Sequence, residues 1–412
     1  MPVILNYGAT GRWTCDVPHG QIVARHSAPA PCPNLSEAIR GALGAPRDFP
    51  PLEQLCVPGD RVLLALDRHT PSAEELIAGV WEVLQRRGVA AEEIMILQPA
   101  ALDAAPVGDP RGLLPKAARE QIRWGIHDPT DPRCQAYLAT TARNERIYLA
   151  REVTDADVVI GLGPIAYDSV LGIRGTGSVL YPGLSNTEAI ARARGEGHRE
   201  LGPDDERPLR QSIDEIAWLL GMQFVVQVIP GAGRVAAKVL AGAPDSVLRA
   251  GRMELDSLWR LTLPERTEVV VLAVEADSAG HGWFQLGEAL ATARNLVAQG
   301  GKIVVLTQLD AEPGDTVELI RQQRSPREAL APIRKQGGLD MIPAAQLASA
   351  ADWAQVYLLS HLASDLVEEL FMTPLESEVE VSRLLGGTAG CVLVEGAQHV
   401  YGEIAASESI SD

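Results

Sequence analysis

The segment RVLLALDRHTPSAEELIAGVWEVLQRRGVAAEEIMIL (residues 61–97) decides the fold class of this sequence. Residues 61–66 form a continuous apolar run of strand length, and residues 74–88 carry apolar side chains at helical spacing until Gly88 ends the pattern. Residues 92–97 predict the next strand. A strand, a helix and a strand within about 40 residues indicate a right-handed crossover between two parallel strands of one sheet.

The same alternation continues along the chain and restarts after Pro264. Further strands are expected at 3–7, 21–24, 145–150, 157–162, 224–229, 267–274, 301–308, 356–359 and 391–396, and further helices at 209–220, 285–299, 316–324, 326–336 and 344–351. The restart predicts a boundary between an N-terminal α/β domain, 1–263, and a C-terminal α/β domain, 264–405. The sequence therefore predicts an α/β protein of two domains, each with a mainly parallel sheet flanked by helices, and a ligand cleft between them.

Composition limits the classes of partner. The 412 residues include 36 Lys and Arg against 54 Asp and Glu, a formal net charge of −18. Because this charge repels phosphate backbones and anionic lipids, we expect no nucleic-acid or membrane partner, while a local Arg cluster still permits a small anionic organic molecule. Every apolar run is shorter than the roughly 20 residues that cross a bilayer. The five cysteines form no C-x-x-C pair, which predicts reduced thiols in a cytoplasmic protein.

The segment GLGPIAYDSVLGIRGTGSVLYPG (161–183) is the strongest candidate for a binding loop. Closely spaced glycines let backbone N–H groups approach a ligand, and long loops after sheet strands are commonly functional. A tightly turned structural loop is the alternative. Its start mimics a dinucleotide fingerprint, but Pro164 interrupts the pattern. The histidines lack H-x-H and H-x-x-x-H spacing, so the sequence predicts no metal site, and His198 is expected in a solvated loop.

Two further segments follow predicted strands, where ligands bind in parallel sheets. In Asp67–Ser72, Arg68 has the forked guanidinium that grips a carboxylate, while Asp67 and His69 offer acid–base groups; helix capping is the alternative. In His281–Glu288, Trp283 and Gln285 offer a ring and an amide to a ligand, with burial in the core as the alternative.

Taken in order, four segments resemble the nickel-dependent lactate racemase family, whose members carry a nickel-pincer nucleotide. Asp67–Ser72 resembles a DRT/TRP-like loop, and Gly163–Gly183 resembles the block G-x-I-x-P-H…G-F-S-G-G-x-K…P-G. A helix motif of the family resembles Arg207-Pro208-Leu209-Arg210 running into residues 213–217. A Y-Q-x-x-K…GG-x-I block of the family resembles Phe284-Gln285 through Gly300-Gly301-Lys302-Ile303. The resemblance implies two α/β domains with a cofactor and hydroxy-acid site in the cleft between them.

The residues that carry the family's chemistry correspond to other residue types in this chain. The first catalytic histidine falls in Leu97–Ala100, which holds no histidine, and the second falls on Asp168. The lysine that holds the nucleotide falls on Ser178, and the nickel-ligating histidine falls on Arg194, one helical turn before His198. An arginine stays protonated and repels a cation, so the resemblance predicts the fold without the covalent nickel cofactor.

The substrate-contacting residues are partly kept. The family's lysine corresponds to Glu288, its neighbouring glutamine is kept as Gln285, and its substrate-binding arginine corresponds to Arg68. We therefore expect a diverged member that binds a small anionic organic molecule, with Asp168 and Glu288 as acid–base groups. The residues expected to line its site are Arg68, Tyr167, Arg174, Ser178, Arg194, Trp283 and Gln285. The alternatives are a non-catalytic ligand-binding or regulatory paralogue, and a true nickel-pincer racemase with relocated ligands.

Overall fold

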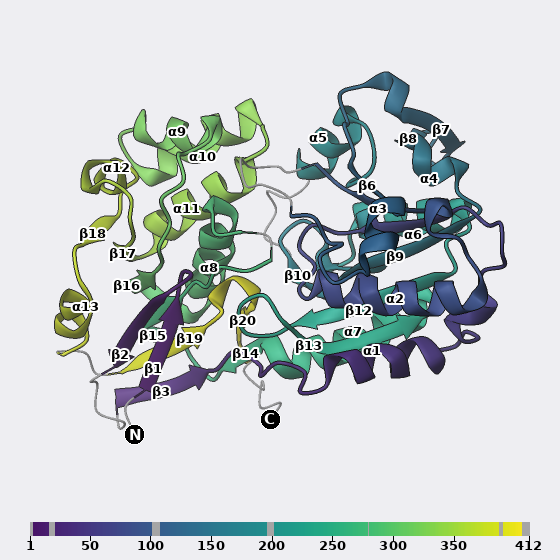
Figure 1. Ribbon diagram of the computed structural model, residues 1–412. Helices are drawn as coiled ribbons and strands as arrows, with labels where there is room; N and C mark the ends of the chain where they lie inside the picture. The colour runs from purple at the N-terminus through teal and green to yellow at the C-terminus, as the bar shows by residue number, and fades with distance from the viewer. Residues whose placement is uncertain are drawn as a thin grey trace, which may run out of the picture. The chain divides into compact units, whose positions relative to one another are not determined.

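Two six-stranded sheets form the cores of the computed structural model, which describes residues 3–15, 21–100, 108–195, 202–278, 280–386 and 390–405 (Figure 1). The chain divides into two compact units. One, here called the inserted unit, is Pro29–Asp256; the other, the terminal unit, joins Met1–Ala28 to Ser257–Asp412. Each unit therefore has its own sheet.

The sheet of the inserted unit is parallel except at one edge. Its strands, in spatial order, are β13 (Ala236–Gly242), β12 (Phe224–Pro230), β9 (Val158–Pro164), β4 (Val62–Leu66), β5 (Ile94–Gln98) and β6 (Arg123–Ile126). Only the β12–β13 pair is antiparallel. Helices α1 (Leu35–Gly44) and α2 (Ala73–Arg87) bury their apolar faces in the same core as these strands. The predicted crossover over 61–97 is therefore confirmed.

The remaining elements of the inserted unit are helices and small sheets. The helices are α3 (Lys116–Gln121), α4 (Arg151–Asp155), α5 (Thr187–Gly195), α6 (Pro208–Leu220) and α7 (Pro244–Trp259), the last of which continues into the terminal unit. The two-stranded sheets pair β7 (Gln135–Thr140) with β8 (Arg146–Ala150), and β10 (Ala166–Asp168) with β11 (Gly172–Arg174). The β10–β11 hairpin lies within the predicted Gly-rich binding loop.

The sheet of the terminal unit is parallel throughout. Its strands, in spatial order, are β18 (Thr373–Leu375), β17 (Gln355–Leu359), β16 (Val297–Leu306), β15 (Thr267–Ala273), β19 (Cys391–Glu395) and β3 (Ile22–His26). The hairpin of β1 (Val3–Tyr7) and β2 (Gly11–Cys15) packs on this sheet through Leu5 and Trp13, and β14 (Arg260–Leu263) pairs with β20 (Tyr401–Ile404). Its helices are α8 (Trp283–Leu296), α9 (Asp315–Arg321), α10 (Pro326–Gln336), α11 (Met341–Trp353), α12 (Ser364–Glu369) and α13 (Glu378–Leu385).

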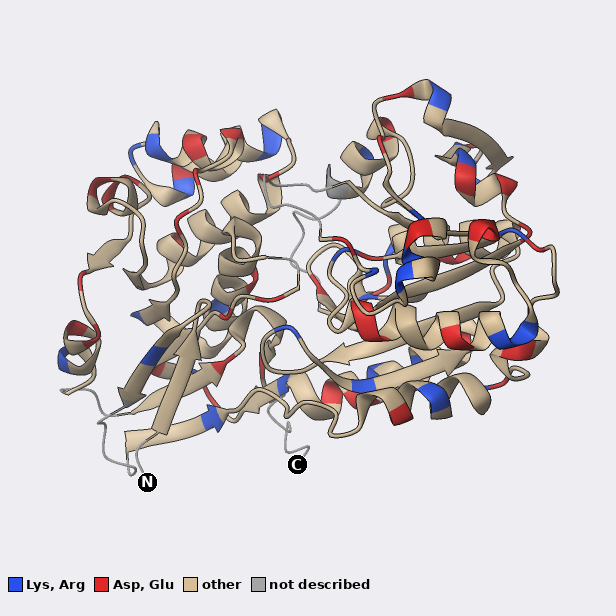
Figure 2. Ribbon diagram, in the orientation of Figure 1, with Lys and Arg blue, Asp and Glu red and all other residues tan. Residues whose placement is uncertain are grey.

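These sheets confirm the predicted α/β class, and buried charge is rare in their strands. Figure 2 shows that most charged residues lie on helices and loops, as expected where helices cover a parallel sheet. Among the described residues, none of the helices combines the length and hydropathy that a membrane span requires.

The compact units differ from the predicted domains in the N-terminal segment. The predicted N-terminal domain began at residue 1, whereas residues 1–28 belong with the C-terminal part of the chain. The physical reason is strand pairing, because β3 hydrogen-bonds in parallel with β19. The second crossing between the units lies at Asp256–Ser257, close to the predicted boundary at Leu263–Pro264.

Candidate functional site

The carboxyl ends of β4 and β9 bring the first two predicted segments together in the inserted unit. Asp67 follows β4 directly, and its amide donates to the carbonyl of Leu162 in β9 at 2.8 Å. Gly163 allows this approach, because a Cβ at that position would lie 3.2 Å from the Cβ of Asp67. The Gly-rich loop then continues from β9 into the β10–β11 hairpin, so that both segments meet at one edge of the sheet.

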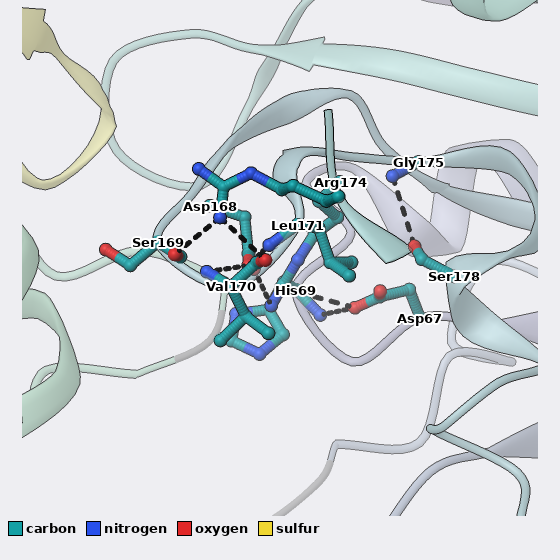
Figure 3. Close-up of polar contacts among 10 residues, drawn as sticks. Asp67, His69, Asp168, Ser169, Val170, Leu171, Arg174, Gly175 and Ser178 are labelled. Atoms are coloured by element: carbon teal, nitrogen blue, oxygen red, sulfur yellow. Dashed lines mark hydrogen bonds and ion pairs between the residues drawn. The ribbon is translucent and has the colours of Figure 1, made fainter. Parts of the chain in front are cut away.

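A guanidinium lies between two carboxylates at this edge (Figure 3). Arg174 Nη2 lies 3.0 Å from Asp168 Oδ2, and Arg174 Nη1 lies 3.9 Å from Asp67 Oδ1. The other oxygen of Asp168 accepts the N–H groups of Val170 and Leu171 at 2.9 and 2.8 Å. The three charged side chains are largely buried, so solvent screens their interactions only weakly. We call Asp67, Asp168 and Arg174 the edge cluster.

A buried glutamine holds the turn that follows β11. Gln227 of β12 is 1% exposed, and its Oε1 accepts the N–H of Thr176 at 2.9 Å. Thr176 has a φ of +53°, a left-handed conformation that is rare for a β-branched residue. Gly175 has a φ of +140°, and a Cβ there would lie 3.0 Å from Ile165 Cγ1. The turn is therefore specified by its surroundings.

Two arginines at the start of α6, which follows the Gly-rich loop in the sequence, also hold this loop in place. Arg207 is buried and donates to the carbonyls of Ser169 and Val170 at 3.0 and 2.7 Å. Arg210 donates to the carbonyl of Gly175 at 3.1 Å and to Thr176 Oγ1 at 2.7 Å. Both guanidiniums thus bind oxygens of the Gly-rich loop. Burial is the main cause that raises the pKa of Asp214, which pairs with Arg210.

Other predicted residues of this unit have polar partners inside the protein. The Tyr167 hydroxyl donates to Asp256 Oδ1 at 2.6 Å. Ser178 is 9% exposed, and its Oγ accepts the N–H of Gly175 at 3.1 Å. Arg68 is half-buried beside Asp67. The side chain of Arg194, and all of His198, lie outside the described residues.

The predicted residues after β15 belong to the terminal unit. Trp283 is buried, and its indole N–H lies within hydrogen-bonding distance of the carbonyls of Ala311 and Glu312, at 3.1 and 2.9 Å. Gln285 is buried, and its Oε1 accepts the N–H of Gly282 at 2.9 Å, which caps α8. Glu288 is half-buried on α8. The ring of Trp283 and the amide of Gln285 thus support the start of this helix, and a ligand contact by these residues stays a prediction.

Sequence reasoning overlooked Gln227 as a supporting residue of this site. A glutamine inside the apolar strand FVVQVI (224–229) was the available signal, since a buried polar side chain needs a partner. Arg207 and Arg210 were noted only as part of a family motif. Their role as donors to loop carbonyls needed the fold, because Arg210 and Gly175 are 35 residues apart.

The comparisons with known proteins agree with the resemblance. Residues 7–198 match the lactate racemase N-terminal domain family. This part of the chain is therefore similar to the N-terminal domain of lactate racemases. Its fold is similar to that of the lactate racemase apoprotein from Thermoanaerobacterium thermosaccharolyticum, with a TM-score of 0.80, 15% identity, and 98% of this chain and 100% of that chain covered. A Thermotoga maritima protein matches with a TM-score of 0.67, 12% identity, and 92% and 100% covered. No curated protein matches the sequence.

The residues of this chain do not fit a lysine-tethered nucleotide in the Gly-rich loop. The chain has four lysines, at 116, 238, 302 and 335, and none lies in 161–183. Ser178, at the position that the resemblance assigns to the tether, uses its Oγ to accept a main-chain N–H. Across the described ranges, no three His, Cys, Asp or Glu side chains converge in a metal-binding arrangement. The edge cluster instead offers a cation between carboxylates.

Proposed function

We propose that this chain is a diverged member of the lactate racemase family, and that it binds a small carboxylic acid, a 2-hydroxy acid or a close relative, at the edge cluster and without a covalent nickel-pincer cofactor. The observation that carries the proposal is the position of Arg174 between Asp67 and Asp168 on the Gly-rich loop. A largely buried guanidinium at the carboxyl ends of parallel strands is suited to binding a carboxylate through two parallel hydrogen bonds.

The contacts of Arg174 with the two carboxylates of the edge cluster differ in length. The 3.0 Å contact with Asp168 has hydrogen-bond length, whereas the 3.9 Å contact with Asp67 is only an ion pair. In the proposal, a ligand carboxylate binds the Nη1 side of Arg174, and Arg68 supplies a second positive charge. Two main-chain N–H groups keep Asp168 Oδ1 in place, so its Oδ2 accepts or returns a proton at the bound hydroxy acid.

A non-catalytic ligand-binding role is the second candidate. It is favoured by the internal hydrogen bonds of Tyr167, Asp168 and Ser178, because these bonds also stabilise the conformation of the loop. Asp168→Asn separates the two candidates, since an amide oxygen still accepts the N–H groups of Val170 and Leu171 but no longer acts as a base. An enzyme would then lose turnover and keep binding, whereas a binding protein would show no turnover before or after the change.

Calorimetric titration of the full chain with a panel of 2-hydroxy acids tests the proposal. We expect binding that Arg174→Ala weakens roughly ten- to a hundredfold, as for loss of a hydrogen bond to a charged group. Arg174→Lys, which keeps the charge and loses the fork, should fall between. Arg40→Ala, an exposed arginine of α1, is the control and should bind normally. Absence of binding by every panel member would refute the proposed ligand class.

The cofactor part of the proposal needs its own measurement. The protein is produced together with the proteins that build the nickel-pincer nucleotide, and its intact mass and nickel content are then measured. We expect the mass of the unmodified polypeptide. A covalent adduct with stoichiometric nickel would contradict this part and favour a true nickel-pincer racemase with relocated ligands.

A further inference from the structure

A cavity in the inserted unit has no role in the proposed function. Its volume is about 590 Å³, and it is bounded by the β10–β11 hairpin, the residues before and at the start of α6, and the first turns of α7. None of the three edge-cluster residues lines it. Its size is within the range of about 300–1,000 Å³ that is typical of small-molecule sites.

The cavity combines an apolar surface with charged groups. Leu171 and Ile173 of the hairpin and Leu248 of α7 supply apolar surface. The charged lining residues divide equally into acids and arginines, and they are Asp204, Asp205, Glu206, Asp245, Arg207, Arg210, Arg249 and Arg252. A lining of both signs selects neither a simple anion nor a simple cation, and it matches a molecule that carries both charges.

Most of these charges already have partners in the protein. Arg207 and Arg210 bind oxygens of the Gly-rich loop, and Arg252 forms an ion pair with Asp204. Asp205 accepts the N–H of Gly202 at 2.6 Å. These groups build the wall of the cavity, and they leave fewer charges for a ligand.

Asp245 and Arg249 differ from the charges that build the wall. They are four residues apart on α7, a spacing at which opposite charges commonly pair. Nevertheless, no ion pair joins them within the described parts of the chain, and Arg249 has only a long contact of 3.4 Å with Ser246 Oγ. Both side chains are exposed and line the cavity beside Leu248. A carboxylate and a guanidinium are therefore presented on one helix face next to apolar surface.

We propose that this cavity binds a zwitterionic amino acid with a large apolar side chain. Arg249 binds its carboxylate, Asp245 binds its ammonium group, and Leu171, Ile173 and Leu248 contact its side chain. Because Asp245 and Arg249 are exposed, the site holds the polar end of the ligand near solvent and places its apolar end against the hairpin. The proposal goes beyond the hydroxy-acid site and does not depend on it.

Calorimetric titration with L-leucine and L-phenylalanine tests the second site. Two matched probes each lack one charge: 2-hydroxyisocaproate has no ammonium group, and isoamylamine has no carboxylate. We expect the amino acids to bind, and Arg249→Ala and Asp245→Asn each to weaken binding about tenfold or more. Arg40→Ala and Glu37→Gln, exposed changes on α1, are the matched controls. Failure of both amino acids to bind, or binding that is unchanged in both cavity variants, would overturn the proposal.

The two sites are distinguished by their variants. Binding of the hydroxy acid should respond to Arg174→Ala and be unchanged in Arg249→Ala, whereas amino-acid binding should respond to Arg249→Ala. Binding of 2-hydroxyisocaproate that is lost in Arg249→Ala would show that the cavity accepts a plain anion, and this result would contradict the zwitterion assignment. Circular dichroism of each variant confirms that a loss of binding is not a loss of fold.

Discussion

The hydrogen bond between Gln227 and Thr176 allows a quantitative test of how the Gly-rich loop is held. Gln227→Leu removes the acceptor of the Thr176 N–H inside a site that is 1% exposed at Gln227 and 3% exposed at Thr176. An unsatisfied buried donor costs about 1–3 kcal/mol. Opening of the turn also releases about 1–2 kcal/mol of left-handed strain at Thr176, but it does so in the wild type and in the variant alike, so this energy cancels from their difference. The free energy that keeps the loop closed should therefore fall by about 2 kcal/mol, and this loss should appear first as local opening of the loop.

Hydrogen exchange measured by mass spectrometry detects this opening directly. A loss of about 2 kcal/mol corresponds to roughly thirtyfold faster exchange in a peptide that contains Thr176. Peptides from the terminal unit should exchange as in the wild type, and the urea midpoint of the inserted unit should fall. Gln85→Leu, which changes an exposed glutamine of α2, is the control. Unchanged exchange at Thr176 with an unchanged midpoint would show that Gln227 does not hold the loop.

Three further predictions concern other contacts. Gly175→Ala should destabilise the inserted unit by about 1–3 kcal/mol in urea unfolding, because a Cβ meets Ile165 at a φ of +140°, whereas Gly44→Ala has open space and should cost nothing. Burial lowers the pKa of His281, so on acidification the unfolded chain binds the proton before the folded one does. The thermal midpoint should therefore fall as the pH drops below about 6.5, and His281→Gln should reduce this pH dependence. A thermal midpoint that rises on acidification would contradict the prediction. Burial raises the pKa of the Cys56 thiol to about 12, so Cys56 should resist a thiol reagent at pH 8 until the protein unfolds, while half-buried Cys32 reacts in the native state; equal rates for the two would refute the assignment.

The continuous apolar runs made most of the central strands predictable. Strands that are covered on both faces by helices are apolar at every position, and the runs near residues 62–66 and 269–273 show this directly. Helix α7 was not predicted, and Gly251 within it interrupts the pattern of good helix formers. The pairing of β3 with β19 could not be read from local pattern, because the partners lie about 370 residues apart in the chain.

The location of the candidate site could be predicted from the sequence, whereas most of its side-chain contacts could not. The rule that ligands bind beyond parallel strand ends selected Asp67 and the Gly-rich loop, and the structure brings Asp67, Asp168 and Arg174 together. The rule could not show that Trp283 would direct its N–H to main-chain carbonyls, since that choice depends on the path of residues 311–312. An exposed or buried position of an aromatic ring follows from tertiary packing, which sequence periodicity does not encode.

Because β3 pairs with β19, the inserted unit interrupts the sequence of the terminal unit; we call the inserted unit the guest and the terminal unit the host. Residues 29–256 enter and leave the terminal unit close together, because His26 Nε2 lies 2.9 Å from the carbonyl oxygen of Leu258. During synthesis the guest is complete before its host, whose sheet must wait for β19 near the end of the chain. Evolution could therefore exchange the guest as a module, and a shortened chain that joins Ala28 to Ser257 should fold into the host alone.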